Sequence, residues 1–193
     1  MNGGVKMDGM VTVALAGNPN SGKTTIFNAL TGARQHVGNY PGVTVDKVEG
    51  RSNVNGRRLA IVDLPGIYSL TAHSEEELVA RNYLLDSAPQ VVVDILDASN
   101  LERNLYLAVQ LLELGIRPVL VLNMHDVAQR SGMRNIRLLF ARFTADVNRC
   151  LAVGRGARGN CRMPRTGCIR PTWASDSPAL PGVGILVSAD AAG

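Results

Sequence analysis

Apolar residues recur with two different periods along the first two thirds of the chain. Over residues 10–16, 57–63, 90–97 and 117–123 they alternate with other residues or run together, which predicts four strands. Between these runs, residues 26–30, 74–85 and 101–112 carry apolar positions at helical spacing. Strands that alternate with helices predict an α/β fold, with a mostly parallel sheet and helices on both faces.

Capping residues indicate where the predicted helices begin and end. Ser74 with Glu77, and Ser99 with Glu102, have the spacing of capping boxes, and Gly32 is suited to end the first helix. We interpret glutamates 75–77 as a solvated helix start favoured by the helix dipole. The buried face of the third helix is predicted to contain Leu101, Leu105, Ala108 and Leu112.

A long polar segment and a hairpin follow the first helix. Residues 33–44 contain glycine, proline and polar side chains, which predicts a loop, and loops of this length in compact domains are usually functional. Residues 43–50 and 57–63 predict two strands that turn at Asn55 and Gly56, a strong hairpin signal.

A glycine-rich turn separates the first strand from the first helix. Gly17, Gly22, Lys23 and Thr24 satisfy the pattern G-x-x-x-x-G-K-[ST] of a P-loop. Its backbone N–H groups and the helix N-terminus are suited to hold phosphates, Lys23 to reach the β- and γ-phosphates, and Thr24 to bind Mg²⁺. We predict a nucleotide site built from Gly17, Asn18, Pro19, Asn20, Ser21, Gly22, Lys23, Thr24 and Thr25.

Two further motifs follow predicted strands. Asp63 and Gly66 form D-x-x-G, in which the aspartate can hold Mg²⁺ through a water and the glycine N–H can meet a γ-phosphate. Asn123, Met124 and Asp126 belong to an N-M-x-D segment, predicted to bind the base. A carboxylate can accept two hydrogen bonds from guanine that adenine cannot offer, so Asp126 favours GTP and GDP over ATP. All three motifs lie where ligands bind in parallel sheets, at the carboxyl ends of strands.

Charge is divided unevenly along the chain. Residues 1–133 carry 11 basic and 13 acidic residues, whereas residues 134–193 carry 9 arginines and 3 aspartates. The basic excess therefore belongs to the last third, and is poor support for nucleic-acid binding by the main domain. No apolar run reaches the ~18–20 residues that span a bilayer. Residues 1–10 lack the pattern of a signal peptide, so we expect a soluble cytoplasmic chain.

Residues 134–193 form an atypical Arg-, Gly- and Pro-rich tail behind a domain predicted to end at residue 133. Three interpretations stay open: an out-of-frame product, a truncated or degenerate gene product, and a genuine basic tail that binds nucleic acid or anionic lipid. Residues 185–189 are left unassigned. The cysteines do not have the spacing of paired zinc ligands and are interpreted as free thiols; they are Cys150, Cys161 and Cys168.

Three histidines invite a metal or catalytic role. His36, His73 and His125 fall in three separate predicted loops and share no ligand spacing. A lone loop histidine is usually only solvated, so we assign them no metal site.

The order of the motifs resembles that of a small GTPase of the translation-factor class. The residues within and around the motifs resemble those of the ferrous iron transport protein B family. The resemblance covers about residues 10–133 and rests on segments 17–25, 34–45, 63–70, 100–107 and 123–126. It implies a cytoplasmic GTPase domain at the N-terminus of a bacterial inner-membrane Fe²⁺ transporter. Full-length members would add a membrane transport domain and self-association. No stretch of this sequence builds an Fe²⁺ pathway by itself.

The resemblance also implies roles for the loops. Thr44 would close on Mg²⁺ and the γ-phosphate from switch I, residues 32–45, and residues 63–71 would form switch II. Ile67 stands where Ras-like proteins place a water-orienting glutamine, so slow hydrolysis would use backbone groups such as that of Gly66, another side chain or an added ion. In similar GTPases an asparagine at the place of Asn20 helps bind K⁺, which would stimulate turnover as an arginine finger does. The implied catalytic set is Lys23, Thr44, Asn20 and Gly66.

Two other functions remain open at this stage. One is a soluble regulatory GTPase of the ribosome-assembly type whose basic tail binds RNA, and the other is a non-catalytic GTP-binding remnant. The family pattern would continue with a last strand and a closing helix that residues 134–193 do not match. We therefore expect the sheet to be incomplete at its C-terminal edge, which matters because domains keep only about 5–15 kcal/mol of net stability.

Overall fold

The computed structural model of this chain describes residues 9–32, 35–54, 56–133 and 184–185. The expectations for the three cysteines, for the arginine-rich stretch 134–183 and for residues 186–189 fall outside these residues.

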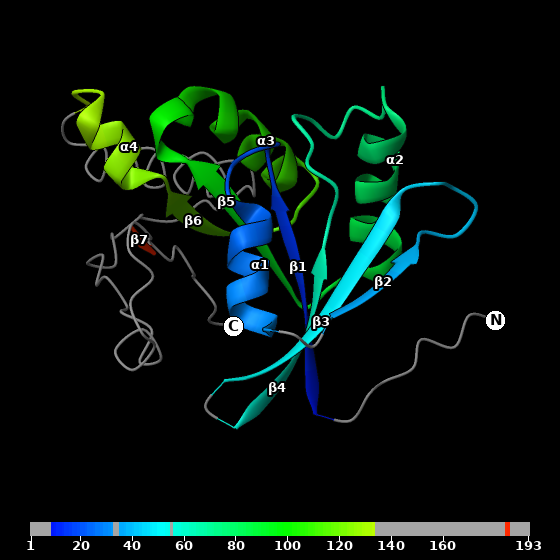
Figure 1. Cartoon of the computed structure of the whole chain (residues 1–193). Coiled ribbons are helices and arrows are strands. Elements are labelled where there is room, and N and C mark those ends of the chain that lie inside the picture. Colours follow the sequence, from blue (N-terminus) through cyan, green and yellow to red (C-terminus); the bar gives the residue numbers. More distant parts are fainter. Residues whose placement is uncertain (1–8, 33–34, 55, 134–183, 186–193) are drawn as a thin grey trace, which may run out of the picture.

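A mixed sheet forms the centre of the domain (Figure 1). Within the described residues it has seven strands in the order β2-β3-β4-β1-β5-β6-β7. Strands β4, β1, β5 and β6 are parallel to one another, whereas β2, β3 and β7 run antiparallel to their neighbours. The strands are β1 (Met10–Gly17), β2 (Gln35–Asn39), β3 (Asp46–Val54), β4 (Arg57–Asp63), β5 (Val91–Asp97), β6 (Val119–Asn123) and β7 (Gly184–Ile185).

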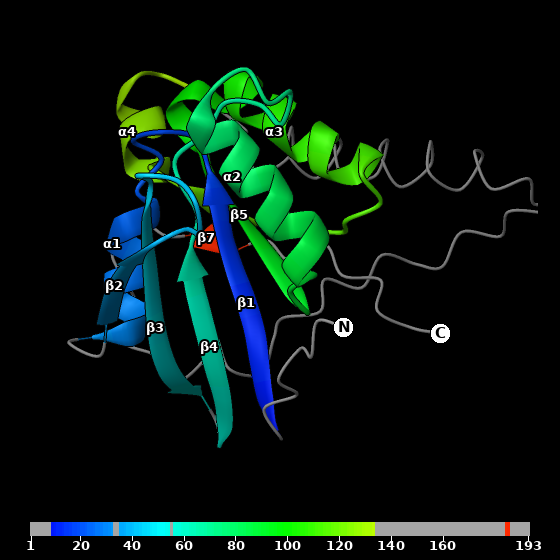
Figure 2. The same ribbon diagram turned by 90° about the vertical axis from the view of Figure 1, so that its right-hand side faces the viewer.

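Helices cover both faces of the sheet, as Figure 2 shows for α1 on one side and α2 and α3 on the other. Ile26 and Phe27 of α1 pack on Leu15, while Leu107 and Leu111 of α3 join the core cluster around Ala14. The alternation of β1 thus fills two cores at once. The helical elements are α1 (Lys23–Thr31), α2 (Glu75–Asn82), the π-helical turn η1 (Tyr83–Ser87), the 3₁₀ turn η2 (Ala98–Asn100), α3 (Leu101–Glu113) and α4 (His125–Arg130).

The α/β architecture, the hairpin between β3 and β4, the end of α1 and the start of α2 are confirmed. The first hairpin strand covers 46–54 rather than 43–50, and α2 gives way to η1 after Asn82 rather than continuing to residue 85. Strands β3 and β4 pair antiparallel around Gly56, which has a φ of +79°. Ser74 caps α2 because its Oγ accepts a hydrogen bond from the Glu77 N–H at 3.2 Å. Gly32 ends α1 with a φ of +60°.

Residues 35–39 correct the prediction of a loop over residues 33–44. They form β2, which pairs antiparallel with β3 from Gln35 opposite Gly50 to Asn39 opposite Asp46. Every β2 residue except Gly38 is exposed, so the strand has no alternation of buried and exposed positions to reveal it. The strand is therefore stabilised by its backbone hydrogen bonds with β3 rather than by burial of side chains.

The start of α3 also differs from the prediction. Ser99 does not cap it: the Asp97 carboxylate accepts hydrogen bonds from the Ser99 N–H at 2.8 Å and the Ser99 hydroxyl at 2.6 Å, which closes the turn η2. The helix begins at Leu101. Its fully buried leucines are Leu107 and Leu111, which the predicted apolar face did not include.

The C-terminal edge of the sheet carries a short strand. Gly184 and Ile185 pair antiparallel with Leu122 and Val121 of β6. Only these two residues beyond 133 are described, so the unassigned segment 185–189 contributes one residue to the described sheet. Among the described residues, no helix combines the length and apolar character that a membrane crossing requires.

Asp94 places a carboxyl group inside the core. It lies on β5 between Ala16 of β1 and Leu120 of β6, and its exposed fraction is 0%. Within the described part of the chain, neither carboxylate oxygen has a hydrogen-bond partner. Burial raises the pKa of Asp94 from 3.8 to about 7, because the charged form is poorly solvated there.

This carboxyl group predicts a pH-dependent stability. The folded state holds the Asp94 proton more tightly than the unfolded state, so the free energy of unfolding falls as pH rises from about 4 to about 7. At 1.36 kcal/mol per pKa unit the loss approaches about 4 kcal/mol. Asp94→Asn should therefore raise the melting temperature relative to wild type more at pH 8 than at pH 5. A melting difference that is the same at both pH values would contradict this.

Candidate nucleotide-binding site

The turn between β1 and α1 is held so closely that its two motif glycines cannot carry side chains. A Cβ on Gly17 would lie 2.7 Å from the Ile95 carbonyl oxygen, and one on Gly22 would collide with Nδ2 of Asn123. Gly22 also has a φ of +86°, which favours glycine, and α1 begins directly after it at Lys23. The P-loop pattern of the sequence therefore corresponds to close packing of this turn against β5 and β6.

Side chains within the turn anchor it to α3 and to the segment after β4. Asn18 is buried and its Nδ2 donates to the Arg103 carbonyl oxygen at 3.4 Å, while the Ser21 N–H donates to the Asn18 carbonyl oxygen at 3.2 Å. Gly66 lies against Pro19, because a Cβ there would come within 3.2 Å of the Pro19 Cα. The D-x-x-G glycine thus adjoins the P-loop.

Lys23 and Asp63 form a buried ion pair at the centre of the site. Lys23 Nζ donates to Asp63 Oδ1 at 2.5 Å, and the two side chains are 10% and 9% exposed. Burial raises the pKa of Asp63, while the charge of Lys23 and hydrogen bonds from Lys23 and Thr24 act in the opposite direction. The pair brings together the ends of β1 and β4.

The N-M-x-D segment joins the same place from β6. The Asn123 Nδ2 donates to the Ser21 carbonyl oxygen at 2.8 Å, which ties this segment to the P-loop. Met124 precedes α4 with a φ of +58°. Asp126 lies in the first turn of α4, exposed, and its Oδ2 accepts from Arg130 Nη2 at 2.6 Å.

The segment after β4 is fastened to β1 and to the P-loop by its backbone. The Leu64 N–H donates to the Leu15 carbonyl oxygen at 3.0 Å, and the Ile67 N–H donates to the Gly17 carbonyl oxygen at 3.2 Å. Ile67 is 3% exposed, so its side chain belongs to the core rather than to the surface of the site.

The same segment is also held on α3. The Leu70 N–H donates to Oε1 of Gln110 at 2.6 Å, and the Arg103 guanidinium lies over the Tyr68 ring at 3.8 Å from its centroid. Since the Arg103 carbonyl also accepts from Asn18, one helix contacts both the P-loop and the predicted switch II.

Glu77 is a contact residue that the sequence interpretation missed. Its carboxylate accepts hydrogen bonds from the Ser69 hydroxyl at 2.7 Å, the Thr71 hydroxyl at 3.3 Å and the His73 N–H at 3.1 Å. Slight burial would raise the pKa of Glu77, but these hydrogen bonds lower it. The solvated-start interpretation is therefore wrong for Glu77. The cluster of hydroxyl residues just before the helix was the available signal.

Several predicted site residues are exposed, and one of them, Thr44, lies apart from the P-loop. Thr44 is in the turn that connects β2 to β3, and Figure 1 shows this cyan turn well separated from the blue P-loop. Asn20 is exposed at the tip of the P-loop with a φ of +65°, and Thr25 is exposed in the first turn of α1. The structure brings Lys23 together with Asp63 but does not add Thr44 to them.

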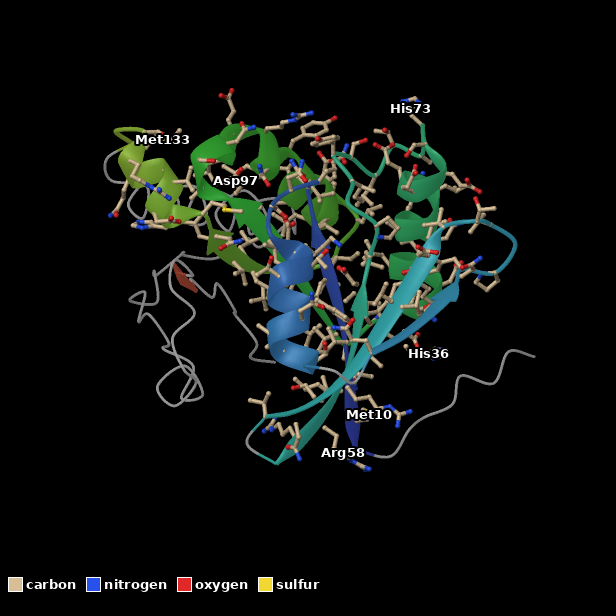
Figure 3. The ribbon with its side chains drawn as sticks, viewed as in Figure 1. Met10, His36, Arg58, His73, Asp97 and Met133 are labelled. Carbon is tan, nitrogen blue, oxygen red and sulfur yellow. The ribbon has the colours of Figure 1, made fainter. Side chains whose placement is uncertain are left out.

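The histidines do not converge. Figure 3 shows His36 on β2 and His73 ahead of α2, far apart in the view, and His125 begins α4. No group of three or more His, Cys, Asp or Glu side chains within the described residues could hold a metal ion.

A sequence model of the family described as ferrous iron transport protein B matches residues 11–156, which is most of the chain. The chain belongs to this family. The Fe(2+) transporter FeoB of Shigella flexneri is 52% identical over 128 residues, covering 64% of this chain and 17% of the relative. That of Methanocaldococcus jannaschii is 58% identical over 103 residues, covering 53% of this chain and 15% of the relative. The chain thus spans about a sixth of the length of these curated FeoB proteins.

Solved FeoB structures have the same fold. The G domain of the T. maritima FeoB iron transporter is 46% identical and superimposes with a TM-score of 0.61 over 63% of this chain and 76% of that one. An S. thermophilus NFeoB mutant bound to mGDP is 51% identical, with a TM-score of 0.61 over 65% of this chain and 48% of that one. The described part of this chain therefore has the P-loop GTPase fold, and its predicted fold class is confirmed.

The buried ion pair can be tested in the protein without nucleotide. Removing one partner of a buried pair leaves an unpaired charge, which costs ~3–5 kcal/mol. Asp63→Ala and Lys23→Ala should therefore each lower the free energy of unfolding in urea by a large part of that amount. The double variant should lose clearly less than the sum of the two single losses, because it leaves no unpaired charge. Additive losses would show that the pair does not stabilise the site.

Proposed function

We propose that this chain is the GTP-binding and GTP-hydrolysing domain of a bacterial ferrous iron transporter, with switch loops that couple its nucleotide state to Fe²⁺ uptake. The observation that carries the proposal is the convergence of three strand ends. Lys23 meets Asp63 at 2.5 Å and Asn123 meets the Ser21 carbonyl at 2.8 Å. The Fe(2+) transporter relatives and the solved FeoB G domains support it.

The phosphates would bind in the turn between β1 and α1. Its backbone N–H groups and the N-terminus of α1 favour negative charge, and Lys23 would exchange its contact with Asp63 for the β- and γ-phosphates. Thr24 and Asp63 offer the hard oxygen ligands that suit Mg²⁺. Bound Mg²⁺ would neutralise charge on the phosphate oxygens. Thr44 would complete this set only after the turn between β2 and β3 has moved.

Guanine would be recognised by the segment after β6. Asp126 would accept two hydrogen bonds from the base, and its contact with Arg130 is an exposed i,i+4 pair worth only ~0.3–0.5 kcal/mol. Guanine would therefore have to displace only this weak contact between Asp126 and Arg130. Asn123 keeps this segment against the P-loop, so the base and phosphate contacts are held in one arrangement.

Hydrolysis would be slow because the usual water-orienting side chain is replaced by buried Ile67. Backbone groups near Gly66 and a bound K⁺ would have to supply the missing stabilisation. The position of Asn20 at the exposed tip of the P-loop supports the proposal that it helps to bind K⁺. A cation there would add positive charge near the transferring phosphoryl group.

We extend to this domain the location and partners that the family resemblance implies. The domain would lie on the cytoplasmic side of the bacterial inner membrane, beside the membrane transport domain of a full-length transporter, and would self-associate there. Its small-molecule partner would be a guanine nucleotide, GTP or GDP.

Guanine selectivity can be measured by thermal unfolding with Mg²⁺ and GTP, GDP or ATP. A ligand at 100 times its Kd should stabilise the folded chain by ~2.7 kcal/mol. GTP and GDP should raise the melting temperature and ATP should not. Asp126→Ala should abolish this preference, whereas the matched variant Arg130→Ala should change guanine-nucleotide affinity by less than about twofold. Equal shifts with ATP and GTP in the wild type would contradict the proposal.

The role of Asn20 can be separated from nucleotide binding by comparing K⁺ with Na⁺. Phosphate release from GTP by the wild type should be faster in K⁺ buffer, and Asn20→Ala should lose most of this difference while GDP affinity stays similar. Equal rates in the two buffers for the wild type would remove the K⁺ role and leave GTP binding intact.

A further inference from the structure

One aromatic side chain in the predicted switch I is buried although its surroundings are exposed. Tyr40 is 6% exposed, whereas Asn39, Pro41 and Gly42 around it are exposed, as is Thr44. Val43 and Val45 of the same turn pack against the same core cluster but are only half-buried. Tyr40 is therefore the main anchor of the turn, since burying an aromatic side chain contributes ~1.5–3 kcal/mol.

Tyr40 packs against the helical layer that follows switch II. Its ring meets that of Tyr83 edge to face, with centroids 6.0 Å apart and planes at 78°. Lys47 of β3 places its Nζ 5.9 Å from the Tyr40 centroid and 5.8 Å from the Tyr83 centroid. Lys47 is also paired with Glu49 at 2.6 Å. The two rings and the ammonium group therefore hold the turn against η1.

The backbone couples Tyr40 to Thr44. The Tyr40 N–H donates to the Val45 carbonyl oxygen at 3.0 Å, and the Val43 N–H donates to the Tyr40 carbonyl oxygen at 3.3 Å. Residues 40–45 therefore form a closed turn, which we call the switch I turn. Thr44 cannot move far while Tyr40 stays in place.

The hydroxyl group of Tyr40 is buried without a hydrogen bond to any other described residue. Burial, and then the charges of Tyr83, Asp63 and Glu49, raise the pKa of Tyr40, so the group stays a neutral phenol beside the aspartate of the nucleotide site. A buried polar group without a partner costs ~1–3 kcal/mol, which makes this docked arrangement easier to leave.

We propose that Tyr40 is a positioning residue that keeps the switch I turn docked on Tyr83, and Thr44 away from the P-loop, until GTP with Mg²⁺ draws the turn inward. The inference rests on the proposed function and concerns the choice between nucleotides. GDP lacks the γ-phosphate that Thr44 would meet, so it binds without undocking Tyr40. GTP must break the contact between the two rings. The docked turn therefore weakens GTP relative to GDP.

Two substitutions of Tyr40 should act in opposite directions. Tyr40→Phe keeps the ring and removes the unpartnered hydroxyl, so it should strengthen docking and lower the affinity ratio of a non-hydrolysable GTP analogue to GDP by about three- to tenfold. Tyr40→Ala should weaken docking and raise that ratio. Tyr83→Ala should behave like Tyr40→Ala, because it removes the surface on which Tyr40 rests.

The test uses the full chain and two measurements. Hydrogen exchange of residues 40–45 without nucleotide should slow in Tyr40→Phe and quicken in Tyr40→Ala and Tyr83→Ala. Affinities for the GTP analogue and for GDP, both with Mg²⁺, give the ratio. Tyr83→Phe is the matched control, because it removes the neighbouring hydroxyl and keeps both rings, and it should leave the ratio unchanged.

Equal changes in GDP and GTP-analogue affinity would overturn the proposal, since they would make Tyr40 a merely structural residue. Unaltered exchange of residues 40–45 in Tyr40→Phe and Tyr83→Ala would also overturn it, even if Tyr40→Ala does not fold. If the wild type binds neither nucleotide, the proposed function fails, and the exchange measurement still decides whether Tyr40 docks the turn.

Discussion

The contact between Lys23 and Asp63 is the constraint on which the rest of the site depends. Two opposite charges, each about nine-tenths buried, meet where β1 and β4 end side by side. Neither would be stable there alone. The pair therefore holds the P-loop and the segment after β4 in register. In the proposed function, the phosphates and Mg²⁺ take over both charges, so binding replaces one buried electrostatic arrangement with another.

Around this pair the structure divides into parts that are already assembled and a part that is not. The contacts of Asn123 with Ser21, of Ile67 with Gly17 and of Asn18 with α3 are formed in this structure. The switch I turn is docked elsewhere, on Tyr83. A GTPase needs this division, because a rigid binding site cannot report which nucleotide it holds. The β2 strand, which lengthens the hairpin, holds the docked switch I turn, and Thr44 with it, in a well-defined position.

Sequence motifs and hydrophobic periodicity predict those parts of the fold and of the candidate site that depend on local sequence. Gly17, Lys23, Asp63 and Asn123 could be predicted because each motif sits on a strand end, and parallel strands bring those ends together. Other features depend on partners distant in sequence. The carboxylate of Glu77 bonds a loop up to eight residues earlier, and Tyr40 is buried by a ring 43 residues away. The edge strand β2 has polar, exposed side chains, and Asp94 interrupts an apolar strand without any compensating sequence signal.

The lack of a side chain at Gly22 has a consequence for how the base and the phosphates of a nucleotide would bind. The Asn123 amide occupies the place that a Cβ on Gly22 would take, so the phosphate turn and the base segment are in direct contact. A shift of either segment would disturb this contact and the hydrogen bond from Asn123 to Ser21. In thermodynamic terms, a nucleoside and a pyrophosphate would act as cooperative ligands, and joining them would yield more than the two separate affinities suggest.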